Sequence, residues 1–335
     1  MTHSNRTGRK DFMQRVLITF DCSLCPDAMD PLRSVAEVDY EFPISLARLL
    51  EIIHRYDAFA CGTGVKIDET ILQRTDRLKI IVTPSTGTDH VDKKAIARRG
   101  IPLLDIATEY QLLDSFTATA EGTWMLLLAC IRQLPRQIER AQAGLIGWGD
   151  PRWAPSQLSG KTIGIIGCGR LGTMVASYAS AFRMRVLAHD IRALSLPHVQ
   201  QVDLDTLLSQ SDVITLHLHL RDETHRFIHR ESFARMKPGV VIVNTARGDL
   251  IDESALVENL RSGHVSAAGL DVVHNEWDPD LARHPIFEYA RAHDNLIITP
   301  HVASACRESI VGARVFIIHK LLDWLRQSDS AASPK

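Results

Sequence analysis

The sequence predicts an α/β protein with two doubly wound parallel-sheet domains, and three observations support this. Short apolar runs suited to buried strands alternate with helical patterns along the chain, which is typical of parallel sheets with covered faces. The 335 residues exceed one ordinary domain, so two domains are expected. The stretch 162–182, TIGIIGCGRLGTMVASYASAF, combines a strand, a glycine-rich turn and a helix in the order found where such sheets bind nucleotides.

The first hundred residues are expected to form a small α/β unit without a dinucleotide fingerprint. Its expected strands are 15–20, 57–61, 78–82 and 101–104, and its expected helices are 67–73 and 93–99. The polar lead-in MTHSNRTGRKDFMQR lacks the apolar core of a secretory signal.

Three glycines in the 162–182 stretch, Gly167, Gly169 and Gly172, have the spacing G-x-G-x-x-G. Gly167 permits a tight turn, Gly169 lets a pyrophosphate approach the backbone, and Gly172 lets the helix pack closely on the strand. The helix N-terminus then offers N–H groups and a partial positive charge to phosphates. Glycines also cluster in ordinary turns between strands and helices, so the triplet alone is weak evidence.

A second strand strengthens the dinucleotide interpretation because it ends at Asp190. An acid at this place holds the hydroxyls of the adenosine ribose. The carboxylate favours NAD over NADP, since it would repel a 2′-phosphate, although Arg192 nearby could soften that repulsion. We therefore expect NAD (NADH) as the cofactor, with NADP less favoured.

Two long helices and a further set of strands complete the chain. A helix over 114–134, ended by Pro135, is apolar on nearly all sides in its second half and should be buried. Residues 143–159 are rich in Gly, Pro and Trp and are expected to form a linker or surface loop. The remaining strands are expected at 186–190, 213–218, 240–244, 267–273 and 295–299, followed by a long amphipathic helix at 304–326.

Composition argues against several classes of protein. The net charge of −2 and the lack of a basic run give no support for a nucleic-acid partner. The longest apolar stretch, 124–131, is too short to span a bilayer, so no membrane partner is expected. Six scattered cysteines suit reduced thiols in a cytoplasmic protein. Cys22 and Cys25 have the spacing of a redox motif, but their flanks do not otherwise resemble one, so a redox role is not favoured.

Three strands of the second half lead into polar residues: Arg247 follows VVIVNTA, Glu276 follows GLDVVHN, and His301 follows NLIITP. Ligands of α/β sheets bind at the carboxyl ends of the strands. Taken singly, each residue has a structural explanation: an ion pair for Arg247, a solvated carboxylate for Glu276, and a turn beside Pro300 for His301.

Taken together, these three residues have a shared chemistry. An arginine can clamp a carboxylate with two hydrogen bonds and polarise an adjacent carbonyl. A histidine titrates near neutrality and can transfer a proton to a carbonyl oxygen. A neighbouring glutamate orients the imidazole and raises its pKa. With NADH, this set would reduce a 2-oxo acid to a 2-hydroxy acid.

With these residues and the motifs around them, the sequence resembles a known family, the D-isomer-specific 2-hydroxyacid dehydrogenases. This family includes glycerate, phosphoglycerate and D-lactate dehydrogenases. The resemblance extends from about residue 16 to 324 and rests on several motifs in the family's order and spacing. These motifs are STGTDHVD, TATAEGTWMLLLA, KTIGIIGCGRLG, NTARGDLIDESAL, GLDVVHNE and NLIITPHVAS. The resemblance implies a Rossmann cofactor domain, 109–299, inserted into a flavodoxin-like substrate domain, 1–108 and 300–335. It also implies a homodimer formed through the cofactor domain.

The resemblance implies a role for each matching residue. Arg247 would bind the substrate carboxylate and carbonyl, and His301 would be the acid and base, with Glu276 as its partner. The backbone of Thr86 and Gly87 would hold the substrate carboxylate in a nest of N–H groups. The implied cofactor contacts are Gly167, Gly169, Arg170, Leu171, Gly172, Asp190, His217, Thr245, Asp271 and His301. Among these, Arg170 and Leu171 would lie at the pyrophosphate, and Thr245 and Asp271 at the nicotinamide end.

Departures from the family pattern concern the substrate. Gly62 stands where phosphoglycerate dehydrogenases carry an arginine, and no regulatory domain is expected after residue 335, which weakens that interpretation. Lys66 could replace the lost anion contact. His217 and His219 share one face of a strand, but no third ligand accompanies them, so no metal is expected. Trp277 follows Glu276 where the family usually has proline.

Two functions follow as hypotheses. The favoured one is an NAD-dependent D-2-hydroxyacid dehydrogenase that acts as a reductase of a small or anionic 2-oxo acid. The alternative is a dimeric regulatory protein of the same fold that senses NADH without turning over a substrate. A sensor has no need of Arg247 and His301 together, so the catalytic set favours the enzyme.

Overall fold

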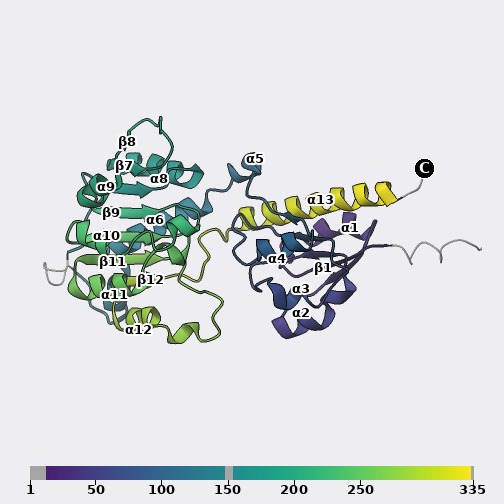
Figure 1. Cartoon of the computed structure of the whole chain (residues 1–335). Coiled ribbons are helices and arrows are strands. Elements are labelled where there is room, and N and C mark those ends of the chain that lie inside the picture. Colours follow the sequence, from purple (N-terminus) through teal and green to yellow (C-terminus); the bar gives the residue numbers. More distant parts are fainter. Residues whose placement is uncertain (1–12, 148–153, 333–335) are drawn as a thin grey trace, which may run out of the picture. The chain divides into compact units, whose positions relative to one another are not determined.

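The computed structural model describes residues 13–147 and 154–332, which fall into two compact units (Figure 1). The split unit comprises the chain up to Phe116 and from Arg307 onward; the inserted unit extends from Thr117 to Cys306. These divisions lie a few residues later than the expected boundaries after 108 and 299, and His301 therefore belongs to the inserted unit. Most of the polar lead-in and residues 148–153 of the expected linker lie outside the described residues.

The split unit is built on a five-stranded parallel sheet in the order β2-β1-β3-β4-β5. Its strands are β1 (Arg15–Ile18), β2 (Glu37–Tyr40), β3 (Ala58–Ala60), β4 (Ile80–Val82) and β5 (Leu103–Leu104). Its helices are α1 (Asp30–Arg33), α2 (Leu46–Ile52), α3 (Glu69–Leu72), α4 (Lys93–Arg98), α5 (Tyr110–Leu113) and α13 (Arg307–Ala332). This strand order is the flavodoxin-like one that the sequence resemblance implied.

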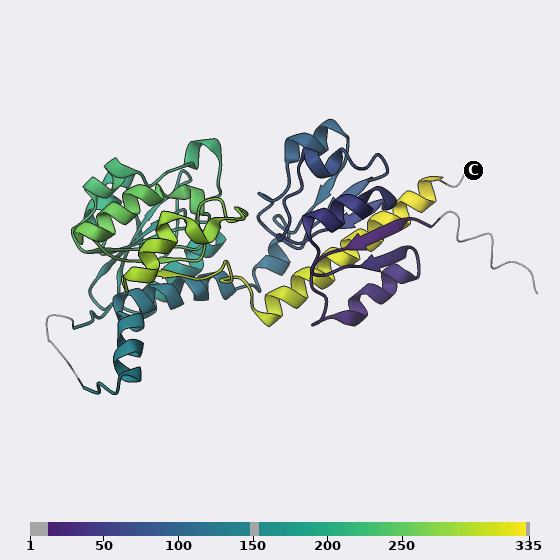
Figure 2. The same ribbon diagram turned by 90° about the horizontal axis from the view of Figure 1, so that it is seen from below.

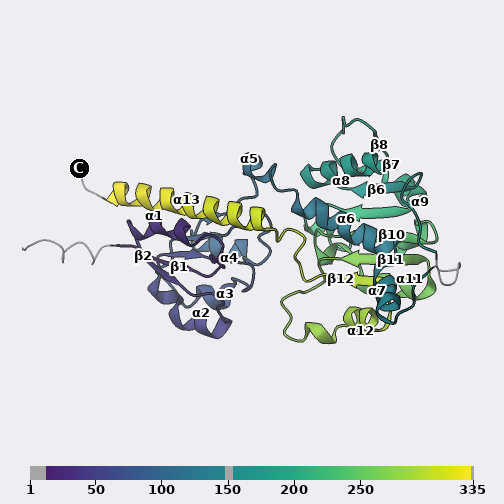
Figure 3. The ribbon, with the colours of Figure 1, turned by 180° about the vertical axis from the view of Figure 1, so that it is seen from behind.

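Alternate residues of the central strands face two separate cores, so the sheet of the split unit is covered on both sides. Val16 and Ile18 pack with Ile317 and other residues of α13, whereas Leu17 and Phe59 pack with α2, α3 and α4. Figures 1 and 3 show α13 lying along one face of this sheet. Because both faces are buried, the strands are continuous apolar runs, which explains why they were predictable.

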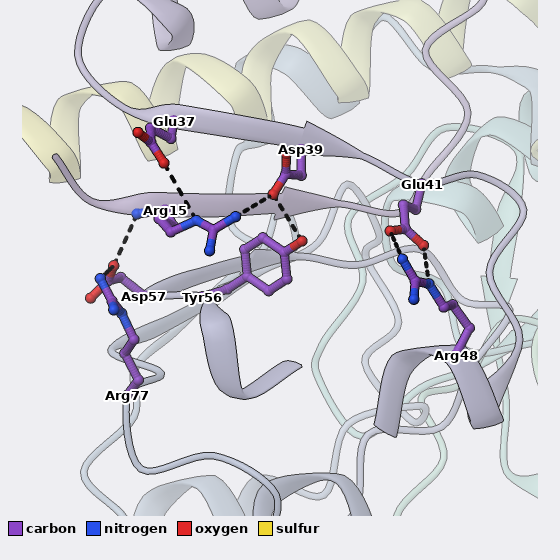
Figure 4. Close-up of polar contacts among 8 residues, drawn as sticks. All are labelled: Arg15, Glu37, Asp39, Glu41, Arg48, Tyr56, Asp57 and Arg77. Carbon is purple, nitrogen blue, oxygen red and sulfur yellow. Dashed lines mark hydrogen bonds and ion pairs between the residues drawn. The ribbon is translucent and has the colours of Figure 1, made fainter. Parts of the chain in front are cut away.

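The edge strand β2 was not predicted from the sequence. Its four residues, EVDY, are partly exposed and include two acids, so they form no apolar run. Arg15 on β1 pairs with Glu37 at 3.5 Å and with Asp39 at 3.0 Å, and the hydroxyl of Tyr56 donates to Asp39 at 2.9 Å (Figure 4). Polar contacts of this kind join the edge strand to its neighbours.

The inserted unit is built on a seven-stranded parallel sheet in the order β12-β11-β10-β9-β6-β7-β8. The strands are β6 (Thr162–Ile166), β7 (Arg185–His189), β8 (Val199–Gln201), β9 (Val213–Leu216), β10 (Val240–Asn244), β11 (Val265–Leu270) and β12 (Leu296–Ile298). The helices are α6 (Ala118–Ile131), α7 (Leu134–Gln142), α8 (Arg170–Ala181), α9 (Leu204–Gln210), α10 (Arg230–Arg235), α11 (Glu253–Ser262) and α12 (Pro285–Ala292). The strand order reverses between β6 and β9, and the crevice outside the carboxyl ends at such a point is where α/β sheets bind ligands.

The sheet of the inserted unit also separates two cores. Ile163 and Ile165 of β6 pack with α6 and α8, whereas Ile214 of β9 and Ile242 of β10 pack with α9, α10, α11 and α12. The short strand β8 was not predicted; two of its three residues are exposed glutamines. The sheet therefore holds the ends of β6, β10, β11 and β12 at fixed places along one edge.

The predicted single helix over 114–134 is wrong in extent. α6 ends at Ile131, Gln133 has a φ of +51°, and α7 begins at Leu134. Pro135 lies in the first turn of α7, where its missing N–H costs no hydrogen bond. Figure 2 shows α7 turning away from α6. Nine of the 14 residues of α6 are buried, as its apolar sequence predicted. In the described part of the chain, neither α6 nor any other helix is long and apolar enough to cross a membrane.

Candidate active site

The predicted dinucleotide turn joins β6 to α8. Gly167 has a φ of +87°, and a Cβ there would lie 2.7 Å from the carbonyl oxygen of His217. A Cβ on Gly172 would lie 2.2 Å from the carbonyl oxygen of Gly167. Both positions therefore require glycine, the first for the turn and the second for the close start of α8.

The start of α8 fits the pyrophosphate of a dinucleotide. Among the described residues, a Cβ on Gly169 would meet only Nη2 of Arg192, at 3.8 Å, so the space above this glycine is open. Gly169 is the N-cap of α8 and has no side chain to accept the first N–H groups. Within the described ranges, the N–H groups of Leu171 and Gly172 donate to no acceptor. These donors, at the positive end of the helix, suit a phosphate.

Asp190 follows β7, where the sequence predicted the ribose contact. Its Oδ2 accepts a hydrogen bond from the N–H of Cys168 at 2.8 Å, which ties it to the glycine turn. Its Oδ1 accepts from the N–H of Arg192 at 2.9 Å and from Nε of Arg192 at 3.3 Å. Burial raises the pKa of Asp190, but the hydrogen bonds from Arg192 and Cys168 outweigh it and bring the pKa below its ordinary value. The residue therefore presents a carboxylate beside the turn.

His217 follows β9, directly beneath the turn. Its Nε2 lies 2.9 Å from the hydroxyl oxygen of Thr215, and burial lowers the pKa of His217 to about 4, so the ring is neutral at physiological pH. Its neighbour His219 is exposed. Across residues 13–147 and 154–332, no group of three or more His, Cys, Asp or Glu side chains is arranged to hold a metal ion.

Arg247, Glu276 and His301 follow β10, β11 and β12, which are neighbours in the sheet. Nδ1 of His301 lies 2.5 Å from Oε2 of Glu276. This hydrogen bond raises the pKa of His301 above its ordinary value, although burial and the positive charge of Arg247 act in the opposite direction. The sheet thus brings the three predicted residues to one edge, with Nε2 of His301 as the ring nitrogen that can serve a substrate.

A buried asparagine shapes the loop of Arg247. Oδ1 of Asn244 accepts the N–H of Ala246 at 3.0 Å, and its Nδ2 donates to the carbonyl oxygen of Arg247 at 2.8 Å. Between them, the hydroxyl of Thr245 lies 2.7 Å from that of Thr123 on α6. Neither Asn244 nor Thr123 was predicted as a site residue. Only the position of Asn244, at the end of an apolar strand, could have indicated it.

Asp271 braces the loop of His301. Its buried carboxylate accepts hydrogen bonds from the Thr299 hydroxyl at 2.6 Å, the Val302 N–H at 2.9 Å and the Ala303 N–H at 2.8 Å. Its carbonyl oxygen accepts the N–H of His301 at 2.8 Å. His301 itself has a φ of +54°, an uncommon conformation for a side chain of this size. Asp271, expected from the sequence to border the nicotinamide, thus uses its carboxylate to hold the segment on either side of His301.

Thr86 and Gly87 lie in the split unit, in the loop that follows β4. Within the described ranges, neither of their N–H groups donates to an acceptor. Behind the loop, Nε2 of the buried His90 lies 3.3 Å from the hydroxyl of Thr83 and 3.9 Å from Sγ of Cys61. The loop therefore offers backbone N–H donors that suit an anion, and the buried His90 supports it.

Family models match both parts of the chain. Residues 16–111 match the model described as D-isomer specific 2-hydroxyacid dehydrogenase, catalytic domain. Residues 124–303 match the model described as D-isomer specific 2-hydroxyacid dehydrogenase, NAD binding domain. The second match contains the glycine turn, Asp190, Arg247, Glu276 and His301.

Individual relatives agree with these matches. A hydroxypyruvate reductase of Thermotoga maritima is 37% identical over 275 residues, which are 82% of this chain and 86% of that protein. A D-3-phosphoglycerate dehydrogenase of Archaeoglobus fulgidus is 34% identical over 303 residues, but the chain spans only 55% of its length. Among solved structures, the D-lactate dehydrogenase of Aquifex aeolicus complexed with NAD and lactic acid superposes with a TM-score of 0.83 and 26% identity. This match covers 96% of the chain and all of that structure.

Proposed function

The chain belongs to the D-isomer-specific 2-hydroxyacid dehydrogenase family, and from this premise we propose that it reduces a 2-oxo acid to a D-2-hydroxy acid with NADH. One observation carries the proposal. The Glu276–His301 pair and Arg247 stand at the ends of three adjacent strands, and the glycine turn stands at the end of β6 in the same sheet.

Each residue of the set has a defined task in this reaction. Arg247 binds the substrate carboxylate through two N–H groups and polarises the adjacent carbonyl. His301 gives the proton on Nε2 to the carbonyl oxygen, and in the reverse direction it takes that proton from the hydroxyl. Glu276 stabilises the charged imidazole before the transfer. NADH, when bound, would supply a hydride for the carbonyl carbon.

The remaining predicted contacts belong to the same proposal. The backbone N–H groups of Thr86 and Gly87 would bind the substrate carboxylate. The N–H groups at the start of α8 would bind the pyrophosphate, and Asp190 would accept the ribose hydroxyls. Thr245 and Asp271 would border the nicotinamide. Because the carboxylate of Asp190 would repel a 2′-phosphate, NADP is the less favoured cofactor.

The substrate is proposed to be a small or anionic 2-oxo acid. Gly62 follows β3 and carries no charge, and a Cβ there would lie 3.3 Å from Cβ of Phe20, so this place offers little room for a larger side chain. Lys66, further along the same loop, is exposed and could meet an anionic substrate. The uncharged Gly62 disfavours a dedicated site for phosphoglycerate, whereas Lys66 favours an anionic substrate.

We also propose that the protein is a homodimer in which a second copy covers α7. This helix buries none of its residues, and its apolar side chains Leu134 and Ile138 are 45% and 47% exposed. Met125 on α6 is 51% exposed. An exposed apolar helix face is suited to a partner, and the family resemblance implies pairing through the cofactor domain. A cytoplasmic location is proposed with it, because Cys22, Cys61, Cys130 and Cys168 are buried thiols.

A substrate panel tests the proposed function. NADH oxidation would be followed with glyoxylate, hydroxypyruvate, pyruvate and larger or phosphorylated 2-oxo acids. Turnover of at least one of them, with a D-2-hydroxy acid as the product, supports the proposal. A folded protein that binds NADH but turns over none of them contradicts it and favours the NADH-sensing alternative.

A further inference from the structure

The loops that carry Arg247 and Glu276 are joined by a pair of side chains outside the catalytic set. Arg247 precedes a short turn, Gly248–Leu250, that contains Asp249. His274 lies two residues before Glu276, on the loop after β11. Nδ1 of His274 is hydrogen-bonded to Oδ1 of Asp249. This contact connects the two catalytic loops.

Backbone contacts hold the same loops together. The N–H of His274 donates to Oε1 of Glu253 at 2.6 Å, and a Cβ on Gly248 would lie 2.0 Å from the carbonyl carbon of Val273. His274 is therefore held through its main chain and through its ring. The next residue, Asn275, has a φ of +53° and turns the chain towards Glu276. Because both the main chain and the ring of His274 are fixed, the positions available to the carboxylate of Glu276 are restricted.

We propose that Asp249 and His274 form a positioning pair that keeps Glu276 in place against His301. The proposal rests on the proposed function, because it concerns the group that protonates the substrate. Glu276 and His301 come from separate loops and meet at 2.5 Å, a distance at which a small displacement weakens a hydrogen bond. Because Glu276 keeps His301 protonated, a loosened Glu276 lets His301 lose its proton at lower pH.

Other charged groups surround the pair and the catalytic histidine. Nε2 of His225 lies 3.9 Å from the same oxygen of Asp249. Burial raises the pKa of Glu253, and the N–H of His274 opposes that effect. Further along the loop, His284 pairs with Asp278 at 3.0 Å. The charged groups that act on His301 are Glu276, Arg247 and Asp271. The pair therefore influences His301 through the position of Glu276.

The pair is exposed enough to be removed without unfolding the protein. The side chains of His274 and Asp249 are 53% and 28% exposed. Ion pairs at such surfaces contribute little to stability. The N–H of His274 still reaches Glu253, and Gly248 still packs against Val273, when the side chains of the pair are removed. The variants should therefore keep the fold, while the side chain of Glu276 becomes more mobile.

The pH profile of the reduction tests the proposal. We expect kcat/KM of His274→Ala to fall at a lower pH than that of the wild type. Glu276→Gln should shift this pH in the same direction and by a larger amount. At neutral pH, kcat/KM should drop by about three- to tenfold, as is typical of residues coupled in one network. The NADH dissociation constant and the melting temperature should be unchanged. Asp249→Ala should give the same shift, and the double variant should add nothing to it.

Two variants serve as matched controls. His225→Ala removes a histidine that faces the same carboxylate from a segment without catalytic residues, and its profile should equal that of the wild type. His274→Gln keeps a donor for Asp249 and should restore most of the activity. NMR titration of the His301 ring gives the same comparison without turnover. A shift in Glu276→Gln without one in His274→Ala overturns the positioning pair and leaves the proposed function intact. No shift in Glu276→Gln overturns the role of Glu276 and with it the positioning pair, while the substrate panel decides the proposed function separately.

Discussion

Nδ1 of His301 and Oε2 of Glu276 lie 2.5 Å apart, so one ring nitrogen serves the carboxylate and the other can exchange a proton with a substrate. The carboxylate raises the pKa of His301, and burial opposes it. The protonated form of His301 therefore persists to higher pH than it would in an ordinary histidine. That form is the one required to reduce a carbonyl.

Reduction and oxidation should depend on pH in opposite senses. Reduction needs protonated His301, so its kcat/KM should fall as pH rises through the raised pKa of His301. Oxidation of the 2-hydroxy acid needs the neutral ring, so its kcat/KM should rise over the same range. For each direction, kcat/KM would be measured as a function of pH, and the midpoint of the profile gives the pKa of His301 before the substrate binds. If kcat/KM changed in the same direction with pH for both reactions, another group would transfer the proton.

Arg247→Lys should lower kcat/KM for the substrate and leave cofactor binding unchanged. Lysine keeps the charge but loses the planar fork that makes two hydrogen bonds to a carboxylate. We expect kcat/KM for the 2-oxo acid to fall about 10- to 100-fold, the value of one charge-assisted hydrogen bond. Arg230→Lys is the control, because Arg230 pairs with Glu258 on the surface. Equal losses in both variants would rule out a specific role for Arg247.

Two glycines of the turn should respond differently to alanine. At Gly169 a Cβ meets only Nη2 of Arg192, at 3.8 Å, so Gly169→Ala should keep its melting temperature and lose NADH affinity. At Gly172 a Cβ would lie 2.2 Å from the carbonyl oxygen of Gly167, so Gly172→Ala should lose both. Thermal unfolding and NADH fluorescence titration would measure the two quantities. Unchanged NADH affinity in Gly169→Ala would contradict the placement of the pyrophosphate.

Asp190→Ala should reduce the preference for NADH over NADPH. The substitution removes the acceptor for the ribose hydroxyls and the charge that repels a 2′-phosphate, while Arg192 stays beside the turn. NADH affinity should fall about tenfold, the cost of one charged hydrogen bond, and NADPH affinity should fall less or rise. Dissociation constants for both cofactors would be compared by fluorescence titration. A parallel loss for both cofactors would mean that Asp190 acts on the fold of the turn.

Ile138→Glu should shift the protein towards a monomer. The side chain is 47% exposed on α7, where a second copy is proposed to pack, and a buried charge there would oppose association. Gln142→Glu adds the same charge on an exposed position of the same helix and serves as the control. Light scattering after size-exclusion chromatography would give the mass of each variant. A wild-type monomer, or a dimer that tolerates Ile138→Glu, would contradict the proposed interface.

Local sequence patterns predicted those parts of the fold that depend on neighbouring residues. The apolar strands, the glycine turn and the polar residues after β10, β11 and β12 were all visible in short stretches. The edge strand β2 was missed because its charged residues form contacts with Arg15 instead of an apolar run. The helix over 114–134 was drawn too long because Pro135, which often ends a helix, here lies in the first turn of the next one.

The supports of the candidate site could not be predicted, because they join residues that are distant in the sequence. Thr123 and Thr245 meet across 122 positions, and His274 reaches Asp249 across 25. Such contacts depend on how strands and helices pack, which no short motif records. Asp271 illustrates the limit, since no short motif indicates that its side chain accepts the N–H groups of Val302 and Ala303.

The most direct test of the central claim is the single-turnover reduction of a 2-oxo acid by the NADH complexes of the wild type and of His301→Ala. We expect His301→Ala to bind NADH with nearly unchanged affinity and to keep its melting temperature. Its rate should fall about 100- to 10,000-fold, the usual contribution of a general acid. A variant that reduces the substrate at the wild-type rate would contradict the assignment of His301 as the proton donor.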